Sequence, residues 1–246
     1  MKNFLCQKNM KNLVFFLTFS CLSATVLAQS PYQLRLGREA GWIGGSAGVT
    51  GVAYLLKSRT PAFTPLQISA LEVSQVPRFD RYSLHHYSIS AQRSSDVVLF
   101  SAIVLPAVLL ADRNIRRDAP QVSVVLGEVF LANYALTRLV KELAHRTRPF
   151  TYNPDVPLTP KLEADARRSF FSGHTSTSAA MSFATAKIWT DYHPHSAWKP
   201  VVWVAAAVIP ATVGYLRMRG GKHFLSDVAV GMVVGAATGV LIPHWH

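Results

Sequence analysis

Two stretches of the chain decide the fold: "VVWVAAAVIPATVGYL" (Val201–Leu216) and "VAVGMVVGAATGVLIP" (Val228–Pro243). Neither stretch has a charged side chain on any face. A helix on the surface of a soluble protein carries a polar stripe along one side. The two stretches therefore favour helices embedded in a membrane. A soluble all-helical core is the alternative, because a membrane-spanning helix needs about 20 residues and several apolar segments are shorter.

Four more apolar segments occur earlier in the chain, at residues 42–56, 97–111, 121–140 and 174–189. All of them are rich in alanine, glycine and valine, whose small side chains let helix backbones approach closely. Residues 57–96, by contrast, are polar and contain three prolines. The sequence therefore predicts an all-α bundle of about six mostly transmembrane helices. It also predicts an extended loop after the first helix, with room for one short amphipathic helix.

The first 28 residues have the layout of a bacterial secretory signal peptide. Three lysines precede an apolar run from Leu13 to Ala28, and small residues there give a cleavage site before Gln29. An uncleaved signal anchor is the alternative. Both cysteines, Cys6 and Cys21, lie in this segment, so a cleaved chain would contain no thiol and no cysteine-ligated metal. We divide the chain into this segment (1–28), an N-terminal apolar segment with a polar loop (29–96), and a core (97–246).

The composition restricts the partners. The formal net charge is +12, and three lysines of the signal segment contribute 3 of it, so the remainder of the chain carries +9. Positive charge favours anionic partners such as lipid headgroups, phosphorylated small molecules or nucleic acid. Half of the residues are hydrophobic and only 15% are charged. Because the chain also lacks a Lys/Arg-rich helix and an aromatic RNA-binding signature, we expect no nucleic-acid partner.

Three polar clusters lie at the ends of apolar segments. They are "KELAHRTRP" (Lys141–Pro149), "FSGH" (Phe171–His174) and "LRMRGGKHFLSD" (Leu216–Asp227). If the last four segments are antiparallel neighbours, all three clusters fall on one side of the bundle. Cations at segment ends also avoid most of the roughly 2.5–3.5 kcal/mol that a charge costs at the bilayer centre. The sequence therefore predicts that the three clusters converge.

Local spacing suggests what each cluster presents. Lys141 and Arg148 are seven residues apart, which places them on one face of a helix. Pro149 disfavours helical geometry at Arg148, so the helix is expected to end there. Ser172 and Gly173 precede a new helix, whose free amide groups and dipole attract an anion.

The third cluster contains a histidine and a carboxylate. His223 and Asp227 are four residues apart, so that both side chains can share one face of a helix. A carboxylate in that position fixes the tautomer of the ring and stabilises its protonated form, as the acid of a catalytic triad does.

Together the clusters read Lys-x6-Arg-Pro, Ser-Gly-His and Arg-x5-His-x3-Asp, a pattern that resembles the signature of the type 2 phosphatidic acid phosphatase superfamily. The resemblance covers residues 97–243 and implies a core like that of the haloperoxidases. Phe171 replaces the proline that usually precedes Ser-Gly-His, and Leu216 replaces the serine that usually precedes the arginine. The missing serine removes one hydrogen bond to phosphate.

The resemblance implies a metal-independent phosphatase that needs no cofactor and works through a phosphohistidine. His223 would be the nucleophile, Asp227 would hold it, and His174 would be the general acid and base. The phosphate would be bound by Lys141, Arg148, Ser172, Gly173 and Arg217.

We expect the substrate to be a lipid phosphate or pyrophosphate, hydrolysed at the periplasmic face of the inner membrane. The arginines of residues 113–117 favour a cytoplasmic location for the turn opposite the site. A cleaved signal followed by a spanning 42–56 segment would instead place the site in the cytoplasm. Either the signal remains as the first membrane helix or residues 42–56 do not cross. The alternatives for the function are a soluble periplasmic nonspecific acid phosphatase, a vanadate-dependent haloperoxidase and a nonenzymatic lipid-phosphate-binding protein.

Other polar residues are predicted to be structural. Glu128 lies within an apolar segment, where an ionisable group usually faces a partner. We expect an arginine from a neighbouring helix to pair with it. No metal site is expected from the remaining histidines, which lack a suitable ligand spacing. We interpret His85, His86, His193 and His195 as solvated loop residues, and His244 and His246 as interfacial.

Overall fold

Each of the six apolar segments contributes to a long helix, which confirms the predicted all-α fold; residues 105–111 of the second segment form a 3₁₀ turn instead. The computed structural model describes residues 30–57 and 59–246, and residues 32–246 form one compact unit. The long helices are α2 (Leu36–Lys57), α4 (Ile89–Val104), α6 (Ala119–Ala144), α9 (Gly173–Tyr192), α10 (Lys199–Arg219) and α11 (Leu225–His244). The predicted signal segment, residues 1–28, lies outside the described residues and stays a prediction.

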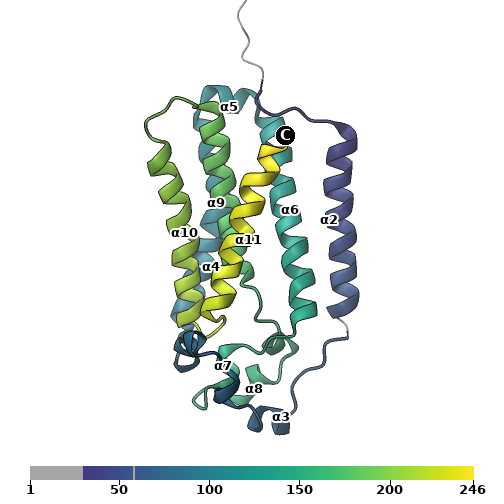
Figure 1. Cartoon of the computed structure of the whole chain (residues 1–246), viewed down its shortest axis with the longest axis vertical. Coiled ribbons are helices and arrows are strands. Elements are labelled where there is room, and N and C mark those ends of the chain that lie inside the picture. Colours follow the sequence, from purple (N-terminus) through teal and green to yellow (C-terminus); the bar gives the residue numbers. More distant parts are fainter. Residues whose placement is uncertain (1–29, 58) are drawn as a thin grey trace, which may run out of the picture. The chain divides into compact units, whose positions relative to one another are not determined.

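Short helical elements connect the long helices. The α-helices among them are α3 (Pro65–Ser69), α5 (Arg113–Arg117), α7 (Pro149–Tyr152) and α8 (Leu158–Lys161). The 3₁₀ turns are η1 (Val73–Gln75), η2 (Arg78–His85), η3 (Leu105–Ala111) and η4 (Ala164–Arg167). Figure 1 shows α3, α7 and α8 at one end of the bundle and α5 at the other. The polar region after α2 is therefore more structured than the predicted loop, and α4 already begins at Ile89.

Four helical stretches in the described part of the chain are long and apolar enough to cross a membrane. They are Ile89–Ala111, Ala119–Tyr152, Lys199–Arg219 and Leu225–His244. These stretches indicate a membrane protein. Helix α2 and helix α9 fall outside this group. In α9, serine and threonine hydroxyls lower the hydropathy, but they are satisfied internally: Ser182 donates to the carbonyl of Ala206 at 2.8 Å.

Helix α11 packs against α9 through a row of glycines. Gly231, Gly235 and Gly239 recur every four residues and therefore lie on one face of α11. A Cβ atom at these positions would lie 2.7, 2.1 and 2.4 Å from carbonyl oxygens of α9 or of the residue preceding it, the last two being those of Ser176 and Ala180. The two backbones thus touch, as small residues at membrane helix interfaces allow. This contact fixes the start of α11 beside the start of α9.

Candidate active site

The three polar clusters of the sequence meet at the end of the bundle that carries α7 and α8 (Figure 1). Helix α6 ends there, α9 and α11 begin there, and the chain leaves α10 there. The side chains of Lys141, Arg148, Arg217 and His223 are all buried, with 1–9% of their surface exposed. The predicted convergence of the clusters is therefore present in the structure.

His223 lies between the cations and a carboxylate. The Nε2 atom of His223 is 3.5 Å from Nη1 of Arg148. On the other side of the ring, Nδ1 lies 3.6 Å from Oδ2 of Asp227 and makes no hydrogen bond within the described chain. One ring nitrogen thus faces the basic side chains and the other faces an acid.

Asp227 is held by several donors. Its Oδ2 atom accepts hydrogen bonds from the hydroxyl of Ser169 (2.5 Å) and from the backbone N–H of Phe224 (2.9 Å). Its Oδ1 atom accepts from Arg146 at 2.5 Å. Asp227 therefore caps the first turn of α11 while it faces His223. Because α11 begins only at Leu225, His223 lies before the helix, and the predicted common helical face for His223 and Asp227 is wrong.

Arg146 connects Asp227 with Asp80, which belongs to the region between α2 and α4. Its Nη2 atom lies 2.6 Å from Oδ2 of Asp80, and the same carboxylate accepts from the backbone N–H and the hydroxyl of Ser226. Both carboxylates are buried, with 1% or less of either side chain exposed. The guanidinium is thus shared by two buried carboxylates, and its removal would leave both without this partner.

His174 has a carboxylate partner that the sequence did not suggest. Nε2 of His174 lies 2.8 Å from Oδ1 of Asp96 in α4, and that oxygen is 3.7 Å from Nη1 of Arg217. A carboxylate at neutral pH only accepts hydrogen bonds, so Nε2 carries the proton. Asp96 therefore fixes the tautomer of His174 and joins it to one of the basic residues.

Lys141 and the first turn of α9 form the remaining wall. Nζ of Lys141 donates to the carbonyl of Arg168 at 2.8 Å. A Cβ atom on Gly173 would lie 3.0 Å from Thr137 and 3.6 Å from Cε of Lys141, so the glycine allows α6 to approach. Ser172 is the N-cap of α9: its hydroxyl accepts from the N–H of Thr175 and contacts the Thr175 hydroxyl at 2.9 Å.

Arg148 is held by backbone groups and not by a helix. Helix α6 ends at Ala144, and Arg148 adopts an extended conformation as the N-cap of α7, so the predicted helical face shared with Lys141 is wrong. Its guanidinium donates to the carbonyl oxygens of Asp165 (2.9 Å) and Lys222 (3.0 Å) and pairs with the Asp165 carboxylate at 3.0 Å. These contacts aim one edge of the guanidinium at His223.

The electrostatic environment keeps His223 neutral. Burial lowers the pKa of His223 well below its usual value, and the nearby charges of Lys141, Arg148 and Arg217 lower it further. The guanidinium of Arg148 and the ammonium of Lys141 in turn lower the pKa of Asp165 despite the opposing effect of burial. The site therefore combines uncharged imidazole with concentrated positive charge, an arrangement suited to a bound anion.

Glu128 does not have the predicted arginine partner. Its Oε2 atom lies 2.8 Å from Nε2 of His246, and the side chain of His246 is fully buried and not interfacial. The cluster they form is at the opposite end of the bundle from the site. His193 also has a carboxylate neighbour, since its Nε2 atom is 3.2 Å from Asp112.

The comparisons with known proteins agree with the pattern of the three clusters. Residues 122–246 match the profile of the PAP2 superfamily, and this chain belongs to that family. It is 30% identical over 129 residues to a probable diacylglycerol pyrophosphate phosphatase of Schizosaccharomyces pombe; the match covers 46% of this chain and 46% of that relative. The chain therefore spans less than half of that relative's length.

A solved structure is also similar to this chain. It is a transmembrane PAP2-type phosphatidylglycerolphosphate phosphatase from Bacillus subtilis. The similarity has a TM-score of 0.48 and 22% sequence identity, and it covers 81% of this chain and 94% of the other.

Proposed function

We propose that this protein is a metal-independent phosphatase that removes phosphate from a lipid phosphate or pyrophosphate through a phosphohistidine. The observation that carries the proposal is the placement of Nε2 of His223 beside Arg148, where the charges of Lys141 and Arg217 also act on the ring. Phosphoryl transfer depends mainly on positioning and charge stabilisation. Three buried cations around one neutral imidazole supply both.

In the first step, the lone pair on Nε2 of His223 attacks the phosphorus atom. A P–N bond forms while the bond from phosphorus to the lipid oxygen breaks. His174 enters this step protonated on both ring nitrogens. It transfers its Nε2 proton to the departing oxygen, which replaces Asp96 as the acceptor, and the ring is left as neutral imidazole. Arg148, Lys141 and Arg217 stabilise the equatorial oxygens, and each such preorganised donor is worth about 2.7–4 kcal/mol.

In the second step, water attacks the phosphorus atom on the side opposite His223. His174, now deprotonated, accepts the proton of that water, and the P–N bond breaks to release inorganic phosphate. Asp227 stabilises the positive charge that the ring of His223 carries while Nε2 is bonded to phosphorus, because its carboxylate lies 3.6 Å from Nδ1. The enzyme returns to its initial protonation state.

A lipid substrate fits the surroundings of the pocket. The site lies at the end of helices that are long and apolar enough to cross a membrane, so the headgroup of a lipid can reach the cations while its chains remain in the bilayer. The S. pombe relative is named for activity on diacylglycerol pyrophosphate. Phosphatidic acid, phosphatidylglycerol phosphate, polyprenyl pyrophosphate and the phosphates of lipid A share the same reacting group.

We place the site at the periplasmic face. Helix α5, with Arg113, Arg116 and Arg117, lies at the end opposite the site (Figure 1), and basic loops favour the cytoplasm. Helix α2 runs alongside α6 and begins at the α5 end. This proposal therefore puts residues 32–35 on the cytoplasmic side, which a cleaved export signal before a spanning α2 would not allow. Labelling of Ser69→Cys but not of His195→Cys by an impermeant maleimide in intact spheroplasts supports it, and the reverse pattern refutes it.

The proposed activity is tested with purified protein and a panel of lipid phosphates. We expect phosphate release from at least one of them, with a loss of about 10⁴-fold or more in His223→Ala. His195→Ala, which changes an exposed histidine at the other end of the bundle, should retain full activity. Acid-labile labelling of His223 by a ³²P-lipid identifies the intermediate. Activity in His223→Ala close to that of the parent would refute the mechanism.

A further inference from the structure

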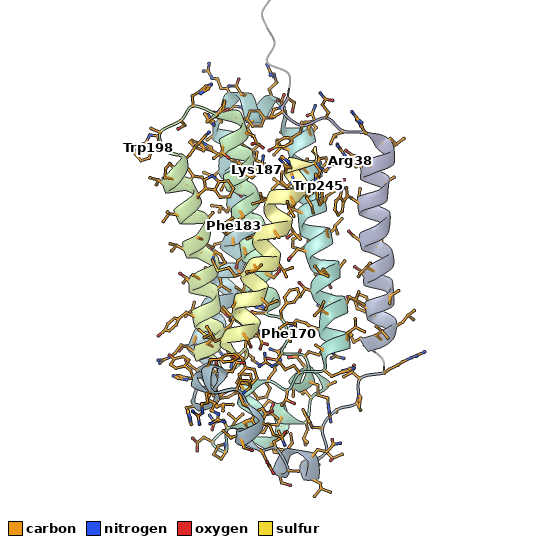
Figure 2. All side chains as sticks on the ribbon, in the orientation of Figure 1. Arg38, Phe170, Phe183, Lys187, Trp198 and Trp245 are labelled. Atoms are coloured by element: carbon orange, nitrogen blue, oxygen red, sulfur yellow. The ribbon has the colours of Figure 1, made fainter. Side chains whose placement is uncertain are left out.

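A second cluster of ionisable side chains lies at the end of the bundle opposite the phosphate pocket. Glu39 comes from the first turn of α2, Glu128 from the third turn of α6, and His246 follows α11. In Figure 2, Arg38 and Trp245, the sequence neighbours of two members, lie at this end between α2 and α11. One ligand atom from each of the three members lies within 4.8 Å of the others.

We propose that Glu39, Glu128 and His246 form a binding site for a single divalent transition-metal ion of the zinc type. Nε2 of His246 lies 2.8 Å from Oε2 of Glu128 and 3.6 Å from Oε1 of Glu39. Two ligand atoms on one zinc ion, with bonds of about 2.0–2.2 Å and tetrahedral angles, lie roughly 3.4 Å apart. The two observed separations bracket that value.

The tautomer of His246 directs a lone pair into the cluster. Nδ1 of His246 lies 2.7 Å from the carbonyl oxygen of Ile242, which can only accept a hydrogen bond, so Nδ1 carries the proton. Nε2 of the neutral ring is then an acceptor, and it faces a carboxylate oxygen at 2.8 Å. Two acceptors this close need either a proton or a metal ion between them. Metal-bound histidines are typically held by such a hydrogen bond from the other ring nitrogen to a carbonyl.

The carboxylates of the cluster also have unused acceptor capacity. Only 2% of Glu128 and 7% of Glu39 is exposed. Oε1 of Glu128 and Oε2 of Glu39 accept no hydrogen bond from any residue in the described part of the chain. Arg38 contacts Oε1 of Glu39 at 3.0 Å, whereas Glu128 is paired with no arginine or lysine among the described residues. Such a group is stabilised by a bound cation.

The mixture of donors selects the type of ion. Mg²⁺ and Ca²⁺ prefer shells made of oxygen ligands, whereas imidazole nitrogen suits zinc and related transition metals. One imidazole and two carboxylates leave the fourth tetrahedral position for water. The ion would join three helices. This matters most for α2, whose buried residues are only Glu39 and two small ones, Ser46 and Ala53.

The test uses the full chain, purified in detergent without a polyhistidine tag and without chelators. We expect about one zinc per chain by inductively coupled plasma mass spectrometry. After EDTA treatment and desalting, zinc should raise the melting temperature by about 5 °C or more, and magnesium should not. Absence of bound zinc together with an unchanged melting temperature on adding zinc would overturn the proposal, because the cluster would then be held by a proton.

Variants assign the ligands. His246→Ala and Glu128→Gln should each lose the bound zinc and the response of the melting temperature to zinc. His193→Ala is the matched control and should retain the metal, because His193 also faces a carboxylate, that of Asp112, but has no second acidic partner among the described residues. Circular dichroism and phosphate release show whether each variant is folded. Zinc retained in folded His246→Ala and Glu128→Gln at the level of the parent would refute the assignment.

Discussion

Nη1 of Arg148 lies 3.5 Å from Nε2 of His223, although 75 residues separate them in the chain. The contact is held from both sides: Arg148 donates to the carbonyl of Lys222, the residue before His223, and to the carbonyl of Asp165. A phosphoryl group bound by this guanidinium would therefore meet Nε2 of the imidazole. These contacts join the proposed phosphate-binding arginine to the proposed nucleophile.

Replacement of Arg148 by lysine should lower kcat by about 10²–10³-fold, the usual effect of removing one preorganised donor. A lysine retains the charge but lacks the planar guanidinium that contacts two carbonyl groups and His223 together. Initial rates on a lipid phosphate measure the effect. Arg219→Lys, at an exposed position in the same region, is the control and should change kcat less than twofold. Equal effects of the two substitutions would contradict the role of Arg148.

Protonation of His223 should not lower kcat/KM as the pH falls through 6.5. Burial and the charges of Lys141, Arg148, Arg217 and His174 lower its pKa well below 6.5, so the ring keeps its lone pair at mildly acidic pH. Because the pKa of His223 is lower in the folded state, its contribution to stability is fully present above pH 6.5 and declines as the pH falls through the folded pKa. A histidine that titrates at 6.5 in ¹⁵N NMR of [¹⁵N]His-labelled protein, and that disappears in His223→Ala, would disprove this.

Arg146→Met should destabilise the protein by about 3 kcal/mol or more, because removal of one member of a buried ionic network leaves the others uncompensated. Asp80 and Asp227 would both lose their cation. Denaturation of the detergent-solubilised protein measures the effect. In a double-mutant cycle, Asp80→Asn should recover part of the loss. Strict additivity of the two substitutions would show that Arg146 and Asp80 do not interact.

Chelation should not change the initial rate of phosphate release at 25 °C. The charges proposed to stabilise the transferred phosphoryl group are those of Lys141, Arg148 and Arg217, and the proposed zinc site lies at the other end of the bundle. EDTA should therefore affect the melting temperature and leave kcat unaltered. Assays before and after chelation, with metal content measured in parallel, separate the two effects. A rate abolished by EDTA and restored by added metal would refute the metal-independent mechanism.

Gly235→Leu should destabilise the bundle by about 1–3 kcal/mol, the usual cost of overpacking. Even a Cβ atom at this position would lie 2.1 Å from the carbonyl of Ser176, so α11 would have to move away from α9. Gly127→Ala in α6 is the control, because nothing lies within 4 Å of its added Cβ. That change should be neutral or stabilising, since alanine favours the helix. Melting temperatures that fall equally in both variants would contradict the proposed contact.

Much of the fold could be predicted from the sequence. The uncharged stretches at 201–216 and 228–243 predicted helices without a polar face, and both are helical in the structure. The convergence of Lys141, Arg148, His174, Arg217 and His223 followed from alternating helix direction. The local geometry did not follow as well, because α6 ends before Arg148 and α11 starts after His223. The spacing of two residues places their side chains on one helical face only where a single helix includes both residues.

The sequence motifs gave no indication of three carboxylates that surround the site. Asp96 was assigned to a polar loop, but α4 begins before it and turns it towards His174. Asp80 reaches the site from 66 residues away through Arg146. Asp165 lies in the connection between α8 and α9 and pairs with Arg148. Arg146 itself was visible only as part of the "KELAHRTRP" cluster.

The sequence by itself determined the helical class, the number of long helices and which of their ends are charged, because hydropathy and motif spacing are properties of the local chain. The pairing of His223 with Asp227 was expected from their spacing. Only the tertiary structure decided which carboxylates accompany two other histidines: Asp96 for His174 and Glu128 for His246. A buried charge loses its hydration, so its free energy depends mainly on the nearest opposite charge. Those neighbours come from helices that are distant in the chain.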